Sequence, residues 1–552
     1  MLRRLLESWL DSASERAYQT AFCQMLSAQG HTIVHSTRHS QLEFGKDVLS
    51  IAPDGTPCAY QLKGNPGSRL TLRQFGEIQN QIVQLVTQPI VFPGLPIRAH
   101  KTYLVTNGVV DEEAQKALDE LNRGFLSAQV LGKPTEIISR GHLIKWANDL
   151  GTCLWPSELE DVNHLLQLLV TQGDEIFPTQ LLNDLLIPLL LLGTDQRVPP
   201  TANELRRRIT SAGILTAVSL RNFSLKQNYW AIISAWVMYA TYVIGSCERF
   251  QKSYNRNAKD SVEIALDVIC LSLSQLCDEL QDRRHLVEGN ALVDSFTYKG
   301  RYTLLVALMS IYWFWSEEKG WSNDKHRDFI DTFIPRAQNK LYLWGEGAVP
   351  QLLLHLWYLR ATDSSNIPDL LLASSLGQII RLSIDDKSNG LPNPYYTFED
   401  VTRHILRGFL ALKEDPFHGD SFRYSSYFAL SLMQLLVRTN LKQTCKSIWP
   451  SFSKMNLKYF LPFKDWMFCL KQAPDGKEIT DQPKLTKEWN ELVNESRDVS
   501  GAGIPKALKE NRFLFFLFIL LFPYRATPSA VRYLGKQFNE SWFIKPPIDK
   551  LM

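Results

Sequence analysis

The chain has 552 residues, of which 45% are hydrophobic and 21% are charged, and its 60 Lys+Arg against 57 Asp+Glu give a formal net charge of +3. A disordered regulator would have fewer apolar residues, and a protein that coats polyanions would be strongly basic, so both classes are excluded. The length predicts a large globular protein of several domains with ample material for a buried core.

Cysteine usage and the N-terminus both indicate a cytoplasmic protein. The eight cysteines are scattered and no two form a CxxC pair, so neither a zinc ribbon nor a disulfide framework is indicated. Near the start of the chain, acidic Glu7 and Asp11 lie within a short apolar stretch, which is not typical of a secretory signal. We therefore predict reduced thiols and a cytoplasmic location.

The hydrophobic pattern changes near residue 155. Before it, short β-type runs alternate with amphipathic helical runs, and after it, long helical patterns rich in Leu, Trp, Phe and Tyr follow one another. This predicts an α/β domain over residues 1–155, with a mixed central sheet flanked by helices. A large all-helical region over residues 156–552 is expected to follow. Subdivisions of the helical region are expected near 290–300, 385–395 and 473–505.

Helices and strands alternate in the predicted α/β domain. The expected elements are a helix over 13–29, a strand at HTIVHST, a hairpin made of KDVLSIA and PCAYQLKG, a helix over 71–86, a strand at KTYLVT, a helix that starts near 111, a strand at TEIIS and a helix over 142–150. Capping boxes at Ser12/Glu15 and Thr71/Gln74 support the first two helices, and Asp54-Gly55 predicts the tip of the hairpin.

One segment of the helical region has the length of a membrane span. From Gln227 to Cys247 no residue is charged, but the stretch is only moderately apolar and carries Asn228, Ser234 and Thr241. A large helical domain needs helices that are apolar all round, so we predict a buried core helix. A membrane-tethered effector is the weaker alternative.

The residues that carry chemistry lie in the stretch EFGKDVLSIAPDGTPCAYQLKG. The predicted hairpin brings Asp47, at the start of one strand, close to Gln61 and Lys63 near the end of the next. Asp47 can supply a carboxylate oxygen, Gln61 an amide oxygen, Leu62 its main-chain carbonyl and Lys63 an ammonium group. Phosphodiester hydrolysis needs such oxygen ligands for a hard divalent cation, and a positive charge near the reacting phosphate.

These motifs resemble a known family. The sequence has Glu15 on the first helix, then Gly45-Lys46-Asp47, a hairpin, Gln61-Leu62-Lys63, and a helix that carries Gln79 and Gln81. This order is similar to that of the PD-(D/E)xK nuclease superfamily, particularly its Mrr-like restriction-endonuclease branch. The stretch YLVTNGVVDEEAQKAL also resembles the segment that closes that fold. The resemblance covers residues 10–150, roughly a quarter of the chain.

The resemblance implies a restriction-endonuclease-like fold and a metal-dependent endonuclease. Such enzymes usually cleave double-stranded DNA, and RNA is the less expected target. Mg²⁺ is the implied cofactor, for which Mn²⁺ can substitute, and Glu15 joins Asp47, Gln61 and the Leu62 carbonyl as a metal ligand. Gln61 stands where most of the superfamily has an acidic residue, although glutamine occurs there in the Mrr-like branch. A bacterial defence role fits the resemblance, with a helical region that restrains the nuclease or binds a partner protein or a second copy.

Other interpretations of the same residues stay open. The α/β domain could be a catalytically inactive nuclease fold that only binds, with a helical region that recruits proteins. Asp47 and Lys63 could form a cross-strand salt bridge, and Glu15 is explained equally well by its capping box.

Basic and histidine-rich segments give weaker signals. Arg69 and Arg73 could contact backbone phosphates, while the run 206–208 is expected to be a solvated helix face. The histidines at 31, 35 and 39 fall on a predicted strand rather than on one helix face, so a zinc site is not expected. No GxxxxGKS loop is present for ATP hydrolysis.

Overall fold

The chain divides into two units, Met1–Ser272 and Leu273–Met552. The computed structural model describes residues 2–36, 45–90, 99–130, 133–150, 159–193, 199–250, 256–283, 295–320, 324–337, 340–362, 367–385, 390–409, 422–471 and 476–540. The predicted domain boundary near residue 155 lies outside the described residues. Unit 1 contains the expected α/β domain together with helices that follow it in the chain.

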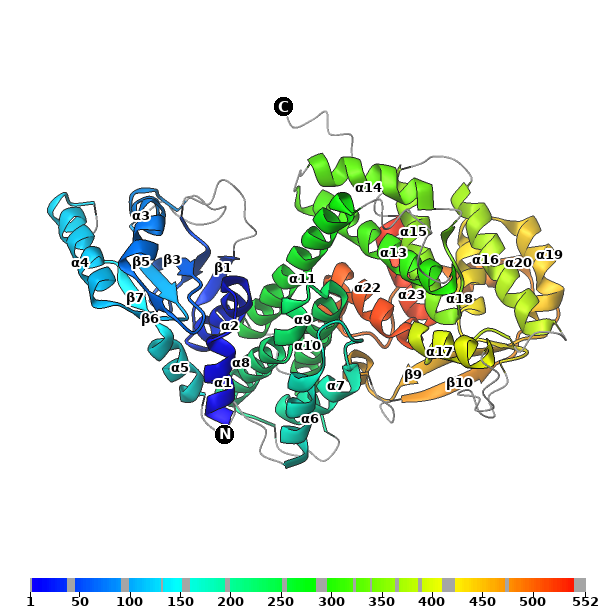
Figure 1. Cartoon of the computed structure of the whole chain (residues 1–552). Helices are drawn as coiled ribbons and strands as arrows, with labels where there is room; N and C mark the ends of the chain where they lie inside the picture. The colour runs from blue at the N-terminus through cyan, green and yellow to red at the C-terminus, as the bar shows by residue number, and fades with distance from the viewer. Residues whose placement is uncertain are drawn as a thin grey trace. The chain divides into compact units, whose positions relative to one another are not determined.

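Unit 1 contains a five-stranded mixed sheet in the order β1-β2-β3-β5-β7 (Figure 1). Its strands are β1 Thr32–Ser36, β2 Val48–Ile51, β3 Pro57–Lys63, β5 Lys101–Thr106 and β7 Glu136–Ile138. β1, β2 and β3 pair antiparallel, whereas β3, β5 and β7 pair parallel. A separate parallel pair joins β4 (Arg69–Leu70) to β6 (Val109–Val110). The expectation of a mixed α/β region at the N-terminus is confirmed.

The helices of this region are α1 Leu2–Leu10, α2 Glu15–Ala28, α3 Leu72–Thr87, α4 Glu112–Ser127 and α5 Arg140–Asp149. The capping box of Thr71 and Gln74 is confirmed at the start of α3. The predicted box of Ser12 and Glu15 is wrong, because the N-cap of α2 is Ser14, whose side chain accepts the Ala17 N–H at 3.3 Å. Glu15 is therefore the first residue of α2, and its carboxylate takes a different partner.

Helices cover both faces of the sheet. On one face, Phe75, Ile78 and Ile82 of α3 pack with Leu104 of β5. On the other face, the ring of Phe22 from α2 packs edge-on against the ring of Tyr60 from β3, with 5.3 Å between the ring centroids. β3 is consequently buried on both sides, as is typical of the central strand of a sheet that helices cover on both faces.

Further helices of unit 1 follow the α/β region in the chain. They include α6 Leu159–Val170, α7 Thr179–Leu189, α8 Ala202–Ser219, α9 Arg221–Leu225, α10 Tyr229–Arg249 and α11 Arg256–Asp282, the last of which runs past the boundary at Ser272. α8 packs along α2, and Gln24 of α2 donates to the Ser261 carbonyl and accepts from the Tyr239 hydroxyl. α2 is therefore shared between the sheet and the helices.

The uncharged segment 227–247 lies mostly in α10, the one described helix long and apolar enough to span a membrane by length and composition. In the structure, 89% of its apolar window is buried inside the protein. Two of its polar groups bond to other helices, since Tyr242 donates to the Asn183 side chain at 2.5 Å and Ser246 donates to the Leu190 carbonyl at 2.8 Å. The buried hydroxyl of Ser234 has no hydrogen-bond partner among the described residues. These are the features of a core helix.

Unit 2 is mostly helical. Its helices are α13 Ser295–Lys319, α14 Asp324–Ala337, α15 Val349–Thr362, α16 Ile367–Ile384, α17 Phe398–Phe409, α18 Ala429–Arg438, α19 Lys442–Phe452, α20 Trp489–Arg497, α21 Lys506–Glu510, α22 Arg512–Leu521 and α23 Pro528–Gly535, with the short 3₁₀ turns η3 Glu346–Ala348, η4 Asp465–Cys469 and η5 Pro523–Arg525 and the π turn η6 Lys536–Glu540. Of the expected breaks, residues 284–294, 386–389 and 472–475 lie outside the described residues.

The expectation that the region after residue 155 is entirely helical is wrong. A three-stranded sheet in the order β10-β9-β8 forms from β8 Ser425–Ser426, β9 Asn456–Pro462 and β10 Gly476–Asp481. β10 pairs antiparallel with β9 and is polar and largely exposed along its length. A strand without an apolar face lacks the alternation that identifies strands in a sequence.

Glu346 of η3 is a carboxyl group in the interior of unit 2, where it is 2% exposed. It accepts hydrogen bonds from the Ser426 hydroxyl and, at 2.8 Å, from the Tyr427 N–H. Burial nevertheless raises the pKa of Glu346 to about 8. The folded protein therefore binds this proton more tightly than the unfolded chain does.

We expect the melting temperature of the full chain to contain a contribution from Glu346 that falls as the pH rises from 4.5 to about 8. In this window the unfolded chain has released the proton that the folded chain retains, so folding becomes less favourable with increasing pH. Glu346→Gln, which imitates the protonated carboxyl, should flatten the dependence. Scanning fluorimetry across the window checks this, with the exposed Glu491→Gln as matched control; equal slopes in wild type and Glu346→Gln would contradict it.

Candidate active site

The carboxylate of Asp47 continues the hydrogen-bond ladder at the end of β3. Its main-chain N–H donates to the Tyr60 carbonyl at 2.8 Å, and its Oδ2 accepts the Leu62 N–H at 2.6 Å. Because β2 begins only at Val48, this side chain takes the place of a main-chain acceptor for Leu62. The hairpin thereby brings Asp47 to the carboxyl end of β3.

Gln61 lies beside Asp47 and is 5% exposed. Its Nε2 donates to Asp47 Oδ2 at 2.5 Å and to the Leu62 carbonyl at 3.1 Å. These contacts orient the amide, because a carboxylate accepts from Nε2 and repels Oε1. Oε1 is buried and has no hydrogen-bond partner among the described residues. Leaving such an oxygen unpaired costs about 1–3 kcal/mol, which a bound cation or donor would recover.

The segment before Asp47 is anchored on α3. Gly45 has a φ of +72°, and a Cβ at this position would lie 2.2 Å from the Gln81 carbonyl oxygen, so no larger residue fits. The buried Lys46 ammonium donates to the Gln84 carbonyl at 3.4 Å, and burial lowers the pKa of Lys46 to about 8. The close contact of Gln81 with this segment is made by its main chain.

Glu15 reaches the same end of β3 from the first turn of α2. Its Oε2 accepts the N–H of Gly64, the residue after β3, at 2.8 Å. A Cβ on Gly64 would lie 3.1 Å from both Cβ and N of Glu15, so glycine permits this close approach. The negative charge also lies at a helix N-terminus, where the helix dipole stabilises it.

Tyr18, one turn after Glu15, joins the ends of two strands. Its hydroxyl lies 3.3 Å from the Lys63 carbonyl of β3 and 3.2 Å from the Val105 carbonyl of β5, and it donates to this pair. Burial and the charges of Glu15 and Asp47 raise the pKa of Tyr18 well above its ordinary value. The hydrogen bonds from the Leu62 N–H to Asp47 and from the Gly64 N–H to Glu15 place both carboxylates at the carboxyl end of β3.

Lys63 is the last residue of β3 and pairs in register with Thr106 of β5. Strand alternation puts it on the same face as Gln61, and its side chain is half-buried. The amide of Gln61 is thus a cross-strand partner of Asp47, and Lys63 lies two residues further along the strand.

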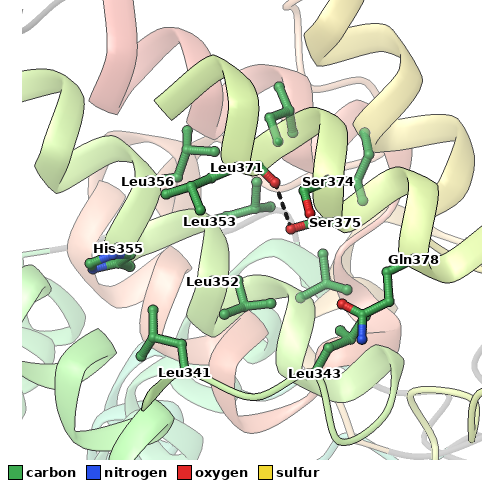
Figure 2. Close-up of a pocket in the computed structure, with 13 residues that line it drawn as sticks. Leu341, Leu343, Leu352, Leu353, His355, Leu356, Leu371, Ser374, Ser375 and Gln378 are labelled. Carbon is green, nitrogen blue, oxygen red and sulfur yellow. Dashed lines mark hydrogen bonds between the residues drawn. The ribbon is translucent and has the colours of Figure 1, made fainter. Parts of the chain in front are cut away.

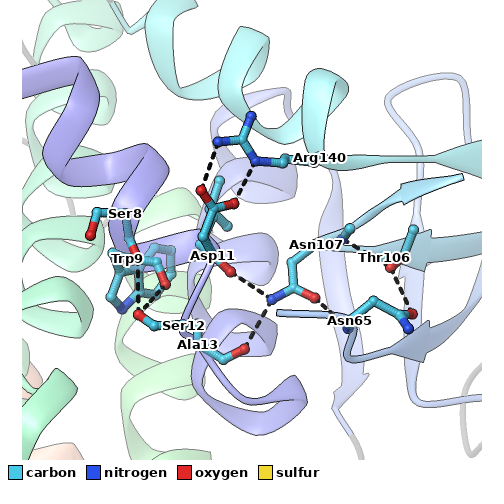
Figure 3. A network of polar contacts seen from close by, with 11 residues as sticks. Ser8, Trp9, Asp11, Ser12, Ala13, Asn65, Thr106, Asn107 and Arg140 are labelled. Carbon is cyan, nitrogen blue, oxygen red and sulfur yellow. Dashed lines mark hydrogen bonds and ion pairs between the residues drawn. The ribbon is translucent and has the colours of Figure 1, made fainter. Parts of the chain in front are cut away.

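A buried polar network fixes the entry to α2 against the sheet (Figure 3). The Asn107 side chain donates to the Leu10 and Ala13 carbonyls at 2.8 and 2.9 Å and accepts the Asn65 N–H at 2.8 Å. Close by, Arg140 donates two hydrogen bonds to Asp11 at 2.6 and 3.0 Å. Because Glu15 follows this segment directly, the network helps to set the position of its carboxylate.

Four of the basic residues singled out in the sequence have polar or acidic partners. Arg69 forms an ion pair with Asp111 at 3.4 Å, and Arg73 lies 3.8 Å from Glu77. Within the run 206–208, Arg208 pairs with Glu204 at 3.0 Å, and Arg206 donates to the Asn203 side chain at 2.8 Å.

Residue His31 contacts the hydroxyl of Ser50 at 2.9 Å next to β1, while residue 39 lies outside the described residues. Across the described part of the chain, no group of three or more His, Cys, Asp or Glu is placed to hold a metal.

Four residues that support the site were not singled out as functional from the sequence: Tyr18, Gly64, Asn65 and Asn107. The sequence pattern could have identified two of them, because Asn65 and Asn107 each closely follow a predicted strand. The carboxyl ends of neighbouring parallel strands meet at one edge of a sheet, so two such residues face the same region.

No family model, no curated protein and no solved structure matches this chain.

Asn107→Ala should lower the free energy of unfolding by at least about 2 kcal/mol, because it leaves two carbonyls and one N–H without their partner. Amide hydrogen exchange at Gly64 should also accelerate, since the entry to α2 that positions Glu15 is loosened. Urea denaturation and exchange mass spectrometry measure the two effects. The exposed Asn148→Ala on α5 is the control and should stay within about 0.5 kcal/mol of wild type; an equal loss in both variants would contradict the role of the network.

Proposed function

We propose that unit 1 carries a metal-dependent nuclease site of the PD-(D/E)xK type at the carboxyl end of β3, and that the chain hydrolyses phosphodiester bonds in nucleic acid. The observation that carries this proposal is the buried Oε1 of Gln61, which lacks a partner although the residue lies beside Asp47. The order α2, β1, β2, β3, α3, β5 is also the one that the sequence resemblance implies.

The donor atoms at this edge suit a small, hard cation such as Mg²⁺. Asp47 and Glu15 would supply carboxylate oxygens, Gln61 its amide oxygen and Leu62 its main-chain carbonyl. The effect of both carboxylates on the pKa of Tyr18 supports their belonging to one site. With only two carboxylates the donor set has a low formal charge, so a neutral amide and a main-chain carbonyl must complete it.

A bound Mg²⁺ would polarise the phosphate and make a water nucleophilic at neutral pH. Lys63, on the face of Gln61, would offset the negative charge that develops on the phosphate oxygens. Tyr18 keeps its proton, because burial and two nearby carboxylates oppose its ionisation, so it holds β3 and β5 together and does not act as a base.

The substrate we propose is nucleic acid, with double-stranded DNA preferred. Residues 1–150 contain 15 Lys+Arg and 14 Asp+Glu, so the α/β domain has almost no net charge to attract phosphates. Attraction must be local, from the cation, Lys63 and exposed side chains such as Arg69 and Arg73.

The second candidate is a nuclease fold that binds without cleaving. It is favoured by the closed set of hydrogen bonds in which Asp47 Oδ2 accepts both the Leu62 N–H and the Gln61 amide. In this interpretation Asp47 only terminates the ladder between β2 and β3. The two candidates differ in whether a divalent cation binds and whether Asp47 is needed for cleavage.

Gln61→Glu should tighten Mg²⁺ and Mn²⁺ binding about tenfold, because a carboxylate replaces a neutral ligand. Without metal the same variant should melt below wild type, since two carboxylates then face each other. Titration calorimetry and melting curves with and without Mg²⁺ test both effects. Gln79→Glu, on the exposed side of α3, is the control. If the melting temperature of the Gln61→Glu protein does not change when Mg²⁺ is added, this result would count against a metal site.

Purified wild-type protein should cleave plasmid DNA in Mg²⁺ or Mn²⁺ and be inactive in EDTA. Asp47→Asn and Lys63→Met should each lose about 10²-fold or more of this activity, because one removes a ligand charge and the other the stabilising cation. Agarose-gel assays, run in parallel on single-stranded RNA, give the rates.

The exposed Asp119→Asn and Lys116→Met on α4 are the matched controls for the cleavage assay and should retain wild-type rates. Cleavage that persists in EDTA or in Asp47→Asn would refute the proposed site. Specific Mg²⁺ binding without cleavage of either substrate would favour the second candidate.

A further inference from the structure

α3 and α4 pack on the same face of the sheet in unit 1 (Figure 1), and an open groove of about 440 Å³ lies between them. Its described lining is apolar apart from Gln79 and the exposed Glu120. Leu72, the first residue of α3, is 46% exposed in this lining. The pocket between α15 and α16 in unit 2 differs, because serines and Gln378 stand among its leucines (Figure 2). The groove between α3 and α4 is therefore a mainly apolar surface that faces solvent.

Two glycines line the groove, one on each helix. Gly76 of α3 and Gly124 of α4 are both exposed. A Cβ at either position would have no described atom within 4 Å, and neither glycine has a positive φ. Glycine weakens a helix relative to alanine, so the packing among the described residues gives no reason for it at these positions. The missing side chains leave room for a side chain of another molecule between the two helices.

The exposed face of α3 also carries a pair of opposite charges. The side chains of Arg73 and Glu77 are 92% and 55% exposed, and Nε of Arg73 lies 3.8 Å from Oε1 of Glu77. An exposed pair at this distance contributes little to stability. Exchange of this contact for one with another molecule would therefore cost the helix little.

We propose that a second copy of this chain docks on the groove, with α3 antiparallel to α3 of the second copy about a two-fold axis. Residues that face each other in such a pair lie at equal distances from the axis along the two helices. Leu72 opposite Gly76 places the axis at residue 74, and Arg73 opposite Glu77 places it at residue 75. One register therefore satisfies both pairs.

The face is complementary to itself, which is what a two-fold interface requires. Leu72 of each copy fills the groove of the other beside Gly76 and Gly124, and Arg73 of each copy pairs with Glu77 of the other. An unrelated partner would have to supply both the apolar side chain and the matching charges. The inference does not depend on the nuclease assignment, and it leaves Arg69 rather than Arg73 for phosphate contacts.

Sedimentation velocity of the full-length protein should show a reversible monomer–dimer equilibrium with a Kd of about 10 µM or below. Leu72→Asp should raise this Kd at least about tenfold, because it puts a charge into the apolar groove. Leu370→Asp, at a leucine of α16 that is 68% exposed, is the matched control and should leave the Kd unchanged.

Gly124→Gln separates the interface from the fold. The longer side chain occupies the groove, so the dimer should weaken at least about tenfold. Because glutamine favours a helix more than glycine does, the melting temperature measured at a concentration where the protein is monomeric should stay equal or rise.

A charge exchange tests the antiparallel register. Arg73→Glu and Glu77→Arg should each weaken the dimer, because each sets like charges opposite each other twice across the interface. The protein with both changes should regain the wild-type Kd, since the same pairs form with their signs exchanged. Circular dichroism establishes that each variant is folded.

Three results would overturn the proposal. The first is a wild-type protein that stays monomeric up to about 50 µM, well above the expected Kd. The second is a dimer whose Kd is unchanged in Leu72→Asp and Gly124→Gln, which would place the interface elsewhere. The third is a dimer that both single charge variants weaken and the double variant does not restore, which would refute the register.

Discussion

One carboxylate at the end of β3 organises the candidate site. The Leu62 N–H needs an acceptor where β2 has not yet begun, and Asp47 Oδ2 provides it at 2.6 Å. The same oxygen accepts from Nε2 of Gln61, so the amide oxygen is turned away from the carboxylate and left without a partner. A buried acceptor without a hydrogen bond destabilises the folded protein by its desolvation free energy unless a donor or a cation binds it. The end of the hydrogen-bond ladder between β2 and β3 therefore sets the position of the Asp47 carboxylate. It also leaves the Gln61 amide oxygen beside it without a hydrogen-bond partner among the described residues.

The second feature that determines the candidate site is α2, which packs both on the sheet and on the helices that follow it in the chain. One side of this helix packs on the sheet and brings Glu15 and Tyr18 to the ends of β3 and β5. Its other side packs on α8, and Gln24 bonds to groups of α10 and α11. The helices that follow the α/β region in the chain thus help to hold the element that carries Glu15. They are part of the support of the site rather than a separate attachment within unit 1.

Buried polar groups mark the places where each unit departs from simple packing. Glu346 is buried with partners, the Ser426 hydroxyl and the Tyr427 N–H, and keeps its proton because its surroundings oppose a charge. Gln61 Oε1 and the ring nitrogens of His355 are buried and have no hydrogen-bond partner in the described part of the chain. The first lies beside the carboxylate of Asp47 and the Leu62 carbonyl, whereas the second lies on α15 between leucines.

The sequence by itself determined the local features of the α/β region. Alternation, the Asp54-Gly55 tip and the capping box at Thr71 are short-range signals, and they placed the hairpin that brings Asp47 beside Gln61. Contacts between distant segments were decided only by tertiary structure. Glu15 bonds to Gly64 instead of capping its own helix, Asn107 holds the entry to α2, and α2 packs along α8. The polar strand β10 was missed because it gains its partner through pairing with β9 and has no apolar face of its own. Such partners lie tens to hundreds of residues away, beyond the reach of any local pattern.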